Sequence, residues 1–121
     1  MIYKAWPNLR YAILGLKVAW RQEAHFRVHV IATVLVILAA FYLDVSMLKL
    51  AILMSACGFV IVTEVLNTAL EELCDKFALE HDPHIGKIKD LAAAAVFVAS
   101  VFAFIIGLCI FLPYLAAYVS L

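Results

Sequence analysis

Three long stretches of the chain carry no charged residue, and shorter polar segments separate them. The uncharged stretches cover residues 30–43, 50–63 and 91–121. A membrane-spanning helix needs about 20 mainly apolar residues, so we extend the first two stretches into their flanks. We predict transmembrane helices at about 28–46, 48–70 and 91–115, with a short turn at 44–49 and a polar segment at 71–90. Pro113 is expected to end or kink the third helix.

The first 27 residues have a different pattern, in which apolar positions recur every three or four residues. Leu9, Ile13, Leu16 and Trp20 follow this spacing, and cationic side chains lie beside the apolar stripe. Apolar and aromatic residues flanked by cations suit the headgroup region of a bilayer. A helix of a soluble domain shows the same period, and the strongly apolar chain that follows favours the membrane. We predict an amphipathic surface helix over 1–27.

The composition supports an all-α membrane protein. Hydrophobic residues make up 68% of the 121 positions and charged residues 15%, whereas a soluble domain is about half apolar and a quarter charged. Mean hydropathy is +1.08. The formal net charge is zero, so nothing indicates a nucleic-acid partner. We expect one domain over 1–121 that the membrane helices themselves insert, with three cysteines that form no disulfide framework.

The distribution of lysine and arginine predicts the orientation in the membrane. Eight of the nine cationic residues lie within 1–27 or 76–89, and Lys49 lies in the turn at 44–49. Cytoplasmic segments carry the excess of positive charge. We therefore expect a multi-pass protein whose N-terminus and 71–90 segment face the cytoplasm, and whose C-terminus lies outside.

The polar residues that follow the second apolar stretch are the main candidates for chemistry. Glu64, Asn67, Glu71 and Asp75 fall within an arc of about 80° on one helix face. Glu64 directly follows a long apolar run, and an ionisable group at that depth is by default a functional candidate. The face suits Mg²⁺ ligands or a desolvated carboxylate acting as a base. The alternative is a packing face whose carboxylates pair with cations on other helices.

Three other polar groups are weaker candidates on spacing alone. Glu23 lies at the junction between the surface helix and the first span, where it either has a function or pairs with Arg27. Lys89-Asp90 precedes the third span, where cations are common. His81 and His84 faintly suggest a metal site, although such a pair is more often a solvated loop.

These motifs resemble those of the prokaryotic diacylglycerol kinase family, which includes the undecaprenol kinases. The resemblance rests on Glu23-Ala-His-Phe-Arg27-Val-His29, on Glu64-Val-Leu-Asn67-Thr-Ala-Leu-Glu71 with Asp75, and on Lys89-Asp90-Leu-Ala-Ala-Ala-Ala-Val. It covers nearly the whole chain. It implies a homotrimer in the bacterial cytoplasmic (inner) membrane, with active sites between subunits, that transfers the γ-phosphate of ATP to a lipid hydroxyl.

The resemblance also implies a role for individual residues. Glu64 is then the base that accepts the lipid hydroxyl proton, Asn67 orients the site, and Glu23 and Glu71 hold Mg²⁺ against the ATP phosphates. The implied nucleotide contacts are Lys4, Tyr11, Glu23, Glu71, Asp75, Glu80, His81, Asp82, Lys89 and Asp90. The implied lipid contacts are Trp20, Arg27, His29, Glu64 and Ala93, with His29 and Ala93 expected on the side where the lipid reaches Glu64.

The residues leave two acceptor lipids open. Arg27-Val-His29, Ala93 and Ile110-Phe-Leu-Pro113 resemble the undecaprenol kinase branch, whereas Ile85-Gly86 departs from its usual pattern. Undecaprenol is favoured, and the alternative is a diacylglycerol kinase that makes phosphatidic acid. Two other classes of protein remain as alternatives. A small transporter or proton-conducting subunit would use Glu64 as a carrier but would not explain the other polar residues. A purely structural membrane subunit explains none of them.

Overall fold

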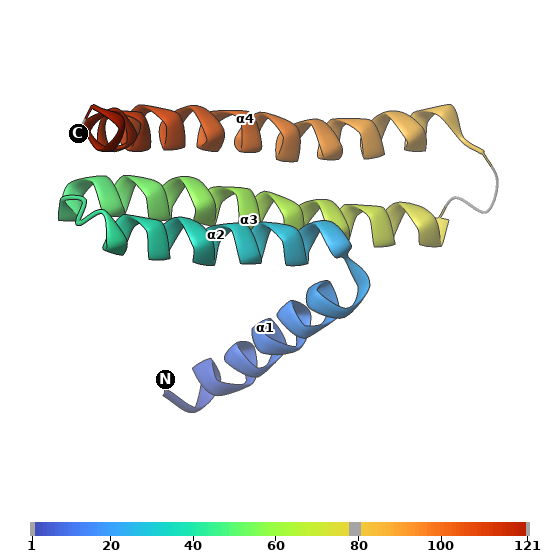
Figure 1. Ribbon diagram of the computed structural model, residues 1–121. Coiled ribbons are helices and arrows are strands. Elements are labelled where there is room, and N and C mark those ends of the chain that lie inside the picture. The colour runs from blue at the N-terminus through green and yellow to red at the C-terminus, as the bar shows by residue number, and fades with distance from the viewer. Residues whose placement is uncertain (1, 78–80, 121) are drawn as a thin grey trace.

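The computed structural model describes the backbone of residues 2–77 and 81–120 and the side chains of residues 8–77 and 81–120. Within these ranges the chain forms four α-helices, in the order α1 (Ile2–Gln22), α2 (Ala24–Tyr42), α3 (Met47–Phe77) and α4 (Pro83–Val119). The three long apolar helices run side by side, and α1 leaves the bundle at an angle from the start of α2 (Figure 1). The predicted all-helical fold is therefore confirmed.

Three of these helices are long and apolar enough to cross a membrane, namely α2, α3 and α4. This agrees with the three predicted spans, although the helices do not share their boundaries. The helices α3 and α4 continue beyond 48–70 and 91–115 into the polar segment, and α2 begins at Ala24 rather than near 28. The predicted spans were given the length that crosses a bilayer, whereas a helix continues wherever its backbone hydrogen bonds are satisfied.

The predicted surface helix over 1–27 is too long at its C-terminal end. Helix α1 ends at Gln22, and Glu23 has an extended backbone with φ −115° and ψ 109° before α2 begins. Arg27 therefore belongs to the first turns of α2. The break places Glu23 at the elbow between α1 and the three-helix bundle.

Pro113 does not end α4, which continues to Val119. The final turns of α4 are seen nearly end-on in Figure 1, which shows that the helix bends close to its C-terminal end. A proline removes one backbone hydrogen bond and bends a helix. Of the two expected effects of Pro113, the kink is therefore observed and the end of the helix is not.

Small side chains allow the three long helices to pack closely. Ala40 on α2 and Ala92 and Ala99 on α4 are buried, and Ala40 packs in one buried cluster with Leu53 on α3 and Ile110 on α4. Large apolar side chains point outward instead, as Phe97 and Phe104 show with 69% and 68% of their surface exposed. Small residues inside and large apolar residues outside are the pattern of a helix bundle in lipid.

The turn between α2 and α3 is fixed by backbone hydrogen bonds. The N–H of Asp44 donates to Phe41 O at 3.2 Å, and that of Val45 donates to Ala40 O at 3.1 Å. These two bonds form a Schellman motif, in which Asp44 takes the left-handed conformation with φ 52°. Aspartate tolerates this conformation better than most residues, and Val45 completes the motif by packing against the cluster that contains Ala40.

Candidate active site

The polar face of α3 begins inside the apolar part of the bundle. Glu64 is only 4% exposed and Thr68 is 7% exposed. The hydroxyl of Thr68 donates to the backbone O of Glu64 at 2.9 Å, so this polar group is satisfied within its own helix. The carboxylate of Glu64 has no such partner on α3 among the described residues, and its neighbours come from another helix.

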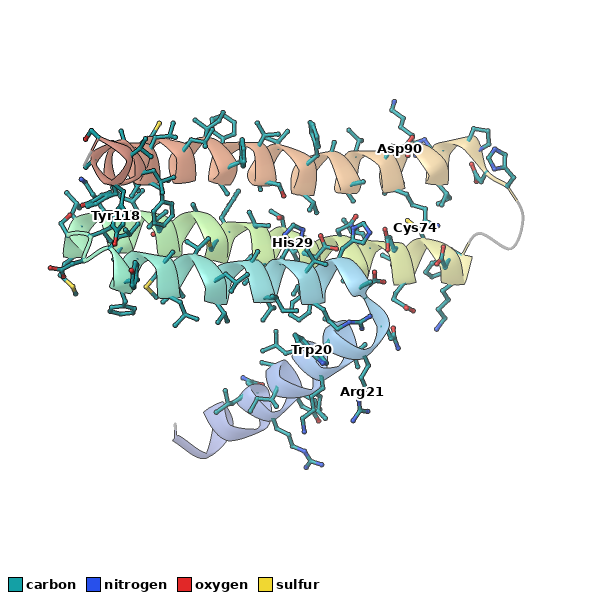
Figure 2. All side chains as sticks on the ribbon, in the orientation of Figure 1. Trp20, Arg21, His29, Cys74, Asp90 and Tyr118 are labelled. Carbon is teal, nitrogen blue, oxygen red and sulfur yellow. The ribbon has the colours of Figure 1, made fainter. Side chains whose placement is uncertain are left out.

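The neighbour of Glu64 is a histidine on α2. His29 Nε2 lies 3.7 Å from Glu64 Oε2, and their side chains are 25% and 5% exposed. Figure 2 shows His29 on the side of α2 that looks toward α3 and α4. No lysine or arginine forms an ion pair with Glu64 in the described residues, and the sequence pattern did not reveal this imidazole as its partner.

One to two turns further along α3, Asn67 and Glu71 form a second polar group. Asn67 Nδ2 donates to Glu71 Oε1 at 3.2 Å, as the spacing of four residues predicts for one helix face. Asn67 Oδ1 is buried and has no hydrogen-bond partner in the described part of the chain. A buried acceptor without a donor costs about 1–3 kcal/mol, so a ligand or another subunit that supplies a donor would be stabilised there.

Glu23 lies at the elbow before α2, and its expected alternative role as a partner of Arg27 is wrong for the described residues. Arg27 Nη1 instead donates to Trp20 O at 2.6 Å and to Arg21 O at 3.3 Å. The last carbonyls of a helix lack intrahelical donors, and the guanidinium supplies them. Trp20 and Arg21 lie on the last turns of α1 in Figure 2, so Arg27 ties α1 to α2 and leaves the Glu23 carboxylate free of that pairing.

We expect Arg27→Met to loosen this elbow, because two carbonyls at the end of α1 lose their donor. A hydrogen bond from a charged group contributes about 1.5–3 kcal/mol, which corresponds to at least about tenfold faster local opening. Hydrogen exchange of the amides around Gln22 and Glu23, measured in detergent, checks this expectation. Arg10→Met is the control, since Arg10 makes no such hydrogen bond in the described residues. Equal exchange in both variants would contradict the assignment.

The helix register places Glu23 and Glu71 at one level of the bundle. Taking the contact between His29 and Glu64 as the reference, Glu71 lies seven residues further along α3, and Glu23, the N-cap of α2, lies six residues back along the chain. The two helices are antiparallel (Figure 1), so Glu71 and Glu23 are displaced from this contact in the same direction along the bundle. At about 1.5 Å per residue the displacement is about 10 Å for Glu71 and about 9 Å for Glu23. The two carboxylates expected to hold Mg²⁺ therefore share a level.

An ion pair sets the corresponding register between α3 and α4. Lys89 Nζ donates to Asp75 Oδ1, and both side chains are largely exposed, at 39% and 65%. Asp75 thus pairs with a cation on another helix, as the alternative interpretation of this helix face predicted. Glu71 lies four residues before Asp75 on α3, and Ala93 lies four residues after Lys89 on α4. Because the two helices are antiparallel (Figure 1), Ala93 and Glu71 lie at the same level of the bundle. Ala93 is therefore about 10 Å along the axis from Glu64, toward the end of the bundle where Asp75 and Lys89 pair.

The described residues contain no group of three or more histidine, cysteine, aspartate or glutamate side chains that could hold a metal ion. This does not conflict with Mg²⁺, which is usually bound through one or two carboxylates, waters and substrate phosphates. Glu71 and the partnerless Asn67 Oδ1 supply hard oxygen atoms close together. The donor chemistry thus fits a magnesium ion that arrives with a phosphate ligand.

The remaining candidate residues are spread over the rest of the described chain. Tyr11 is 70% exposed, and Trp20, His81, Asp82 and Asp90 are also exposed. Asp82 has a structural role as the N-cap of α4, because its side chain accepts from His84 N at 2.9 Å. The side chain of Lys4 and all of Glu80 lie outside the described residues.

A cavity of about 370 Å³ opens beside His29, between α2, α3 and α4. Apolar groups line most of it, including Val36, Val60 and Phe104, and the polar lining consists of His29, Thr33, Cys57 and Ser100. The three cysteines are free thiols, as expected. Thr33, Cys57 and Ser100 were not singled out in the sequence, because isolated small polar residues in an apolar run give no periodic signal.

Comparison with known proteins identifies the group to which these features belong. The model of the prokaryotic diacylglycerol kinase family matches residues 10–111. The chain belongs to the prokaryotic diacylglycerol kinase family. It is accordingly a membrane lipid kinase whose phosphate donor is ATP, and this decides against the transporter and structural alternatives.

Individual relatives cover most of the chain. It is 36% identical over 102 residues to a diacylglycerol kinase of Escherichia coli, with 84% of this chain and 83% of the relative covered. A diacylglycerol kinase of Synechocystis is 39% identical over 112 residues, with 88% and 64% covered. An undecaprenol kinase of Bacillus subtilis is 38% identical over 93 residues, with 77% and 76% covered. These similar identities do not separate the two acceptors.

Proposed function

We propose that this kinase transfers the γ-phosphate of ATP to the single hydroxyl of undecaprenol in preference to diacylglycerol, with Glu64 as the general base. The observation that carries the role of Glu64 is its burial, at 4% exposure, on the helix that also carries Asn67 and Glu71. The terminal hydroxyl of a membrane lipid can reach this depth, where the carboxylate is placed to accept its proton.

In this mechanism Glu64 takes the hydroxyl proton as the lipid oxygen attacks the γ-phosphorus and ADP leaves. Phosphoryl transfer depends mainly on positioning and charge neutralisation. Glu23 and Glu71 are the residues that would hold Mg²⁺, which neutralises phosphate charge when bound. Asn67 orients Glu71 through the hydrogen bond described above, and Lys89 and Asp90 contact the nucleotide at the end of the bundle where α3 and α4 pair.

The apolar cavity beside His29 supports the preference for undecaprenol. A polyprenol presents one hydroxyl and an apolar tail, whereas diacylglycerol adds ester and glycerol oxygens. Each buried oxygen without a donor costs about 1–3 kcal/mol, and few donors line this cavity. Trp20, Arg27 and Ala93 are assigned to the lipid near the cytoplasmic surface, and Tyr11, Asp75, His81 and Asp82 to the nucleotide, as the family resemblance implies.

The same proposal includes the assembly and its place in the cell. A homotrimer in the bacterial inner membrane would cover part of the large apolar surface that one chain exposes, and a neighbouring subunit can supply the donor that Asn67 Oδ1 lacks. The lysine and arginine distribution supports a cytoplasmic α1 and 71–90 segment, with the C-terminus outside. α1 then lies at the cytoplasmic surface of the bilayer.

The test is ATP-dependent phosphorylation of undecaprenol and diacylglycerol, side by side in matched detergent micelles. We expect a higher kcat/KM for undecaprenol, and we expect Ala93→Ser to narrow the ratio by up to about tenfold, or roughly 1.4 kcal/mol. Ala94→Ser is the control, since it adds the same hydroxyl to the neighbouring exposed position of α4. Equal or reversed preference in the parent protein would defeat the undecaprenol assignment.

A further inference from the structure

Glu64 faces a difficulty that its burial creates. A base that accepts a proton in every turnover must lose it before the next one, and Glu64 is almost fully enclosed, with its side chain 5% exposed. The low exposure of this carboxylate hinders direct release of the proton to water. A second titratable group beside Glu64 would therefore have to take the proton away.

His29 has the position and the chemistry for this task. Its Nε2 lies 3.7 Å from Glu64 Oε2, and its side chain is 25% exposed, five times the fraction of Glu64. The separation is longer than a hydrogen bond, and a small side-chain rotation closes it. A neutral imidazole accepts a proton at one ring nitrogen and can release another from the second.

We propose that His29 is a relay residue, which takes the proton from Glu64 after each phosphoryl transfer and passes it to water at the cytoplasmic side. This inference rests on the proposed role of Glu64 as the base. The lipid O–H bond breaks as the new O–P bond forms, and the γ-phosphorus separates from ADP. The proton first joins a Glu64 carboxylate oxygen and then moves from Oε2 to Nε2 of neutral His29, which makes the ring an imidazolium. A proton then leaves Nδ1 for water, and exchange with water returns the remaining proton from Nε2 to Nδ1, which restores both groups.

The surroundings of His29 favour transfer with Glu64 over other partners. On its own helix, Arg27 is engaged with two carbonyls of α1, and His25 is exposed one turn earlier. The cavity beside His29 receives Cys57 from α3 and Ser100 from α4. Glu64 is the acidic side chain within ion-pair distance of His29 in the described part of the chain.

The experiment separates this role from the lipid contact that the family resemblance implies for the same residue. A relay acts after the lipid is bound, so His29→Gln should lower kcat by about 100-fold or more, within the range of about 10²–10⁴-fold that is typical of proton-transfer groups. The KM values for lipid and ATP should stay within about twofold. His25→Gln is the matched control and should keep the kcat of the parent.

Added imidazole provides a readout that a merely structural residue would not give. We expect imidazole to raise the kcat of His29→Ala severalfold and to leave Glu64→Gln unchanged, because the free base replaces the relay but not the carboxylate. Size-exclusion chromatography and circular dichroism in detergent verify that the variants are folded. Failure of imidazole to raise the activity of folded His29→Ala would overturn the relay.

Two other results would also overturn it, namely a kcat of His29→Gln within about twofold of the parent, or a loss that lies entirely in the lipid KM. Each leaves the kinase itself intact, since the parent and His25→Gln phosphorylate lipid in the same assay. Absence of ATP-dependent lipid phosphorylation by the parent would instead defeat the proposed function.

Discussion

Glu64→Gln should lower kcat by at least about 100-fold while the protein stays folded. Glutamine keeps the size and much of the polarity of the side chain but accepts no proton at neutral pH, and loss of a general base costs about 10²–10⁴-fold. Because Glu64 is buried and its titratable neighbour in the described chain is His29, no other carboxylate of α3 is placed to replace it. The measurement is the initial rate of phospholipid formation at saturating ATP and lipid.

Glu72→Gln is the control for this variant. Glu72 lies on the same helix and carries the same charge, but it is exposed, so its replacement should leave the rate close to that of the parent. A folded Glu64→Gln protein that retains more than about a tenth of the parent activity would remove Glu64 from the role of base. The buried carboxylate would then be a packing feature of the bundle.

Replacing Glu23 or Glu71 should raise the magnesium requirement or eliminate activity. The register places both carboxylates at one level of the bundle, and Glu71 is held by Asn67. We expect Glu23→Ala and Glu71→Ala to increase the Mg²⁺ concentration for half-maximal rate by at least about tenfold, since even changes around metal ligands cost about 10–100-fold in affinity. The measurement is a magnesium titration at constant ATP.

Two further variants show whether charge or shape matters at this level. Glu71→Gln preserves an oxygen that accepts from Asn67 but removes the negative charge, so a metal role predicts a raised requirement there too. Glu72→Ala removes a neighbouring exposed charge and should follow the parent curve. Titrations of Glu23→Ala and Glu71→Ala that overlay the parent would show that neither carboxylate binds the metal.

The sequence predicted the number and order of the helices because each apolar run is long and free of charge. It did not predict the break at Glu23, since no glycine or proline marks residues 22–24. That break depends on a tertiary contact, in which Arg27 reaches back to the carbonyls of Trp20 and Arg21. The helices also exceed the predicted spans, because bilayer thickness limits a span and not a helix.

The candidate site was predictable where it depends on one helix. The 3.6-residue period placed Asn67 and Glu71 on one face, and their hydrogen bond confirms this. The pairing of His29 with Glu64 depends on how α2 and α3 are rotated against each other, which periodicity within either helix does not contain. The level of Ala93 was not predictable for the same kind of reason, since the α3–α4 register is visible only once Asp75 and Lys89 meet.

The turn at Asp44 serves the chain as a spacer of fixed length. Its two backbone hydrogen bonds fix the length of the connection between α2 and α3. The number of residues between His29 and Glu64 therefore determines whether their side chains face each other. One residue inserted into α3 ahead of Glu64 would turn the carboxylate by about 100° around the helix axis and shift it by about 1.5 Å. A change of length in the hairpin between α2 and α3 would therefore separate His29 from Glu64.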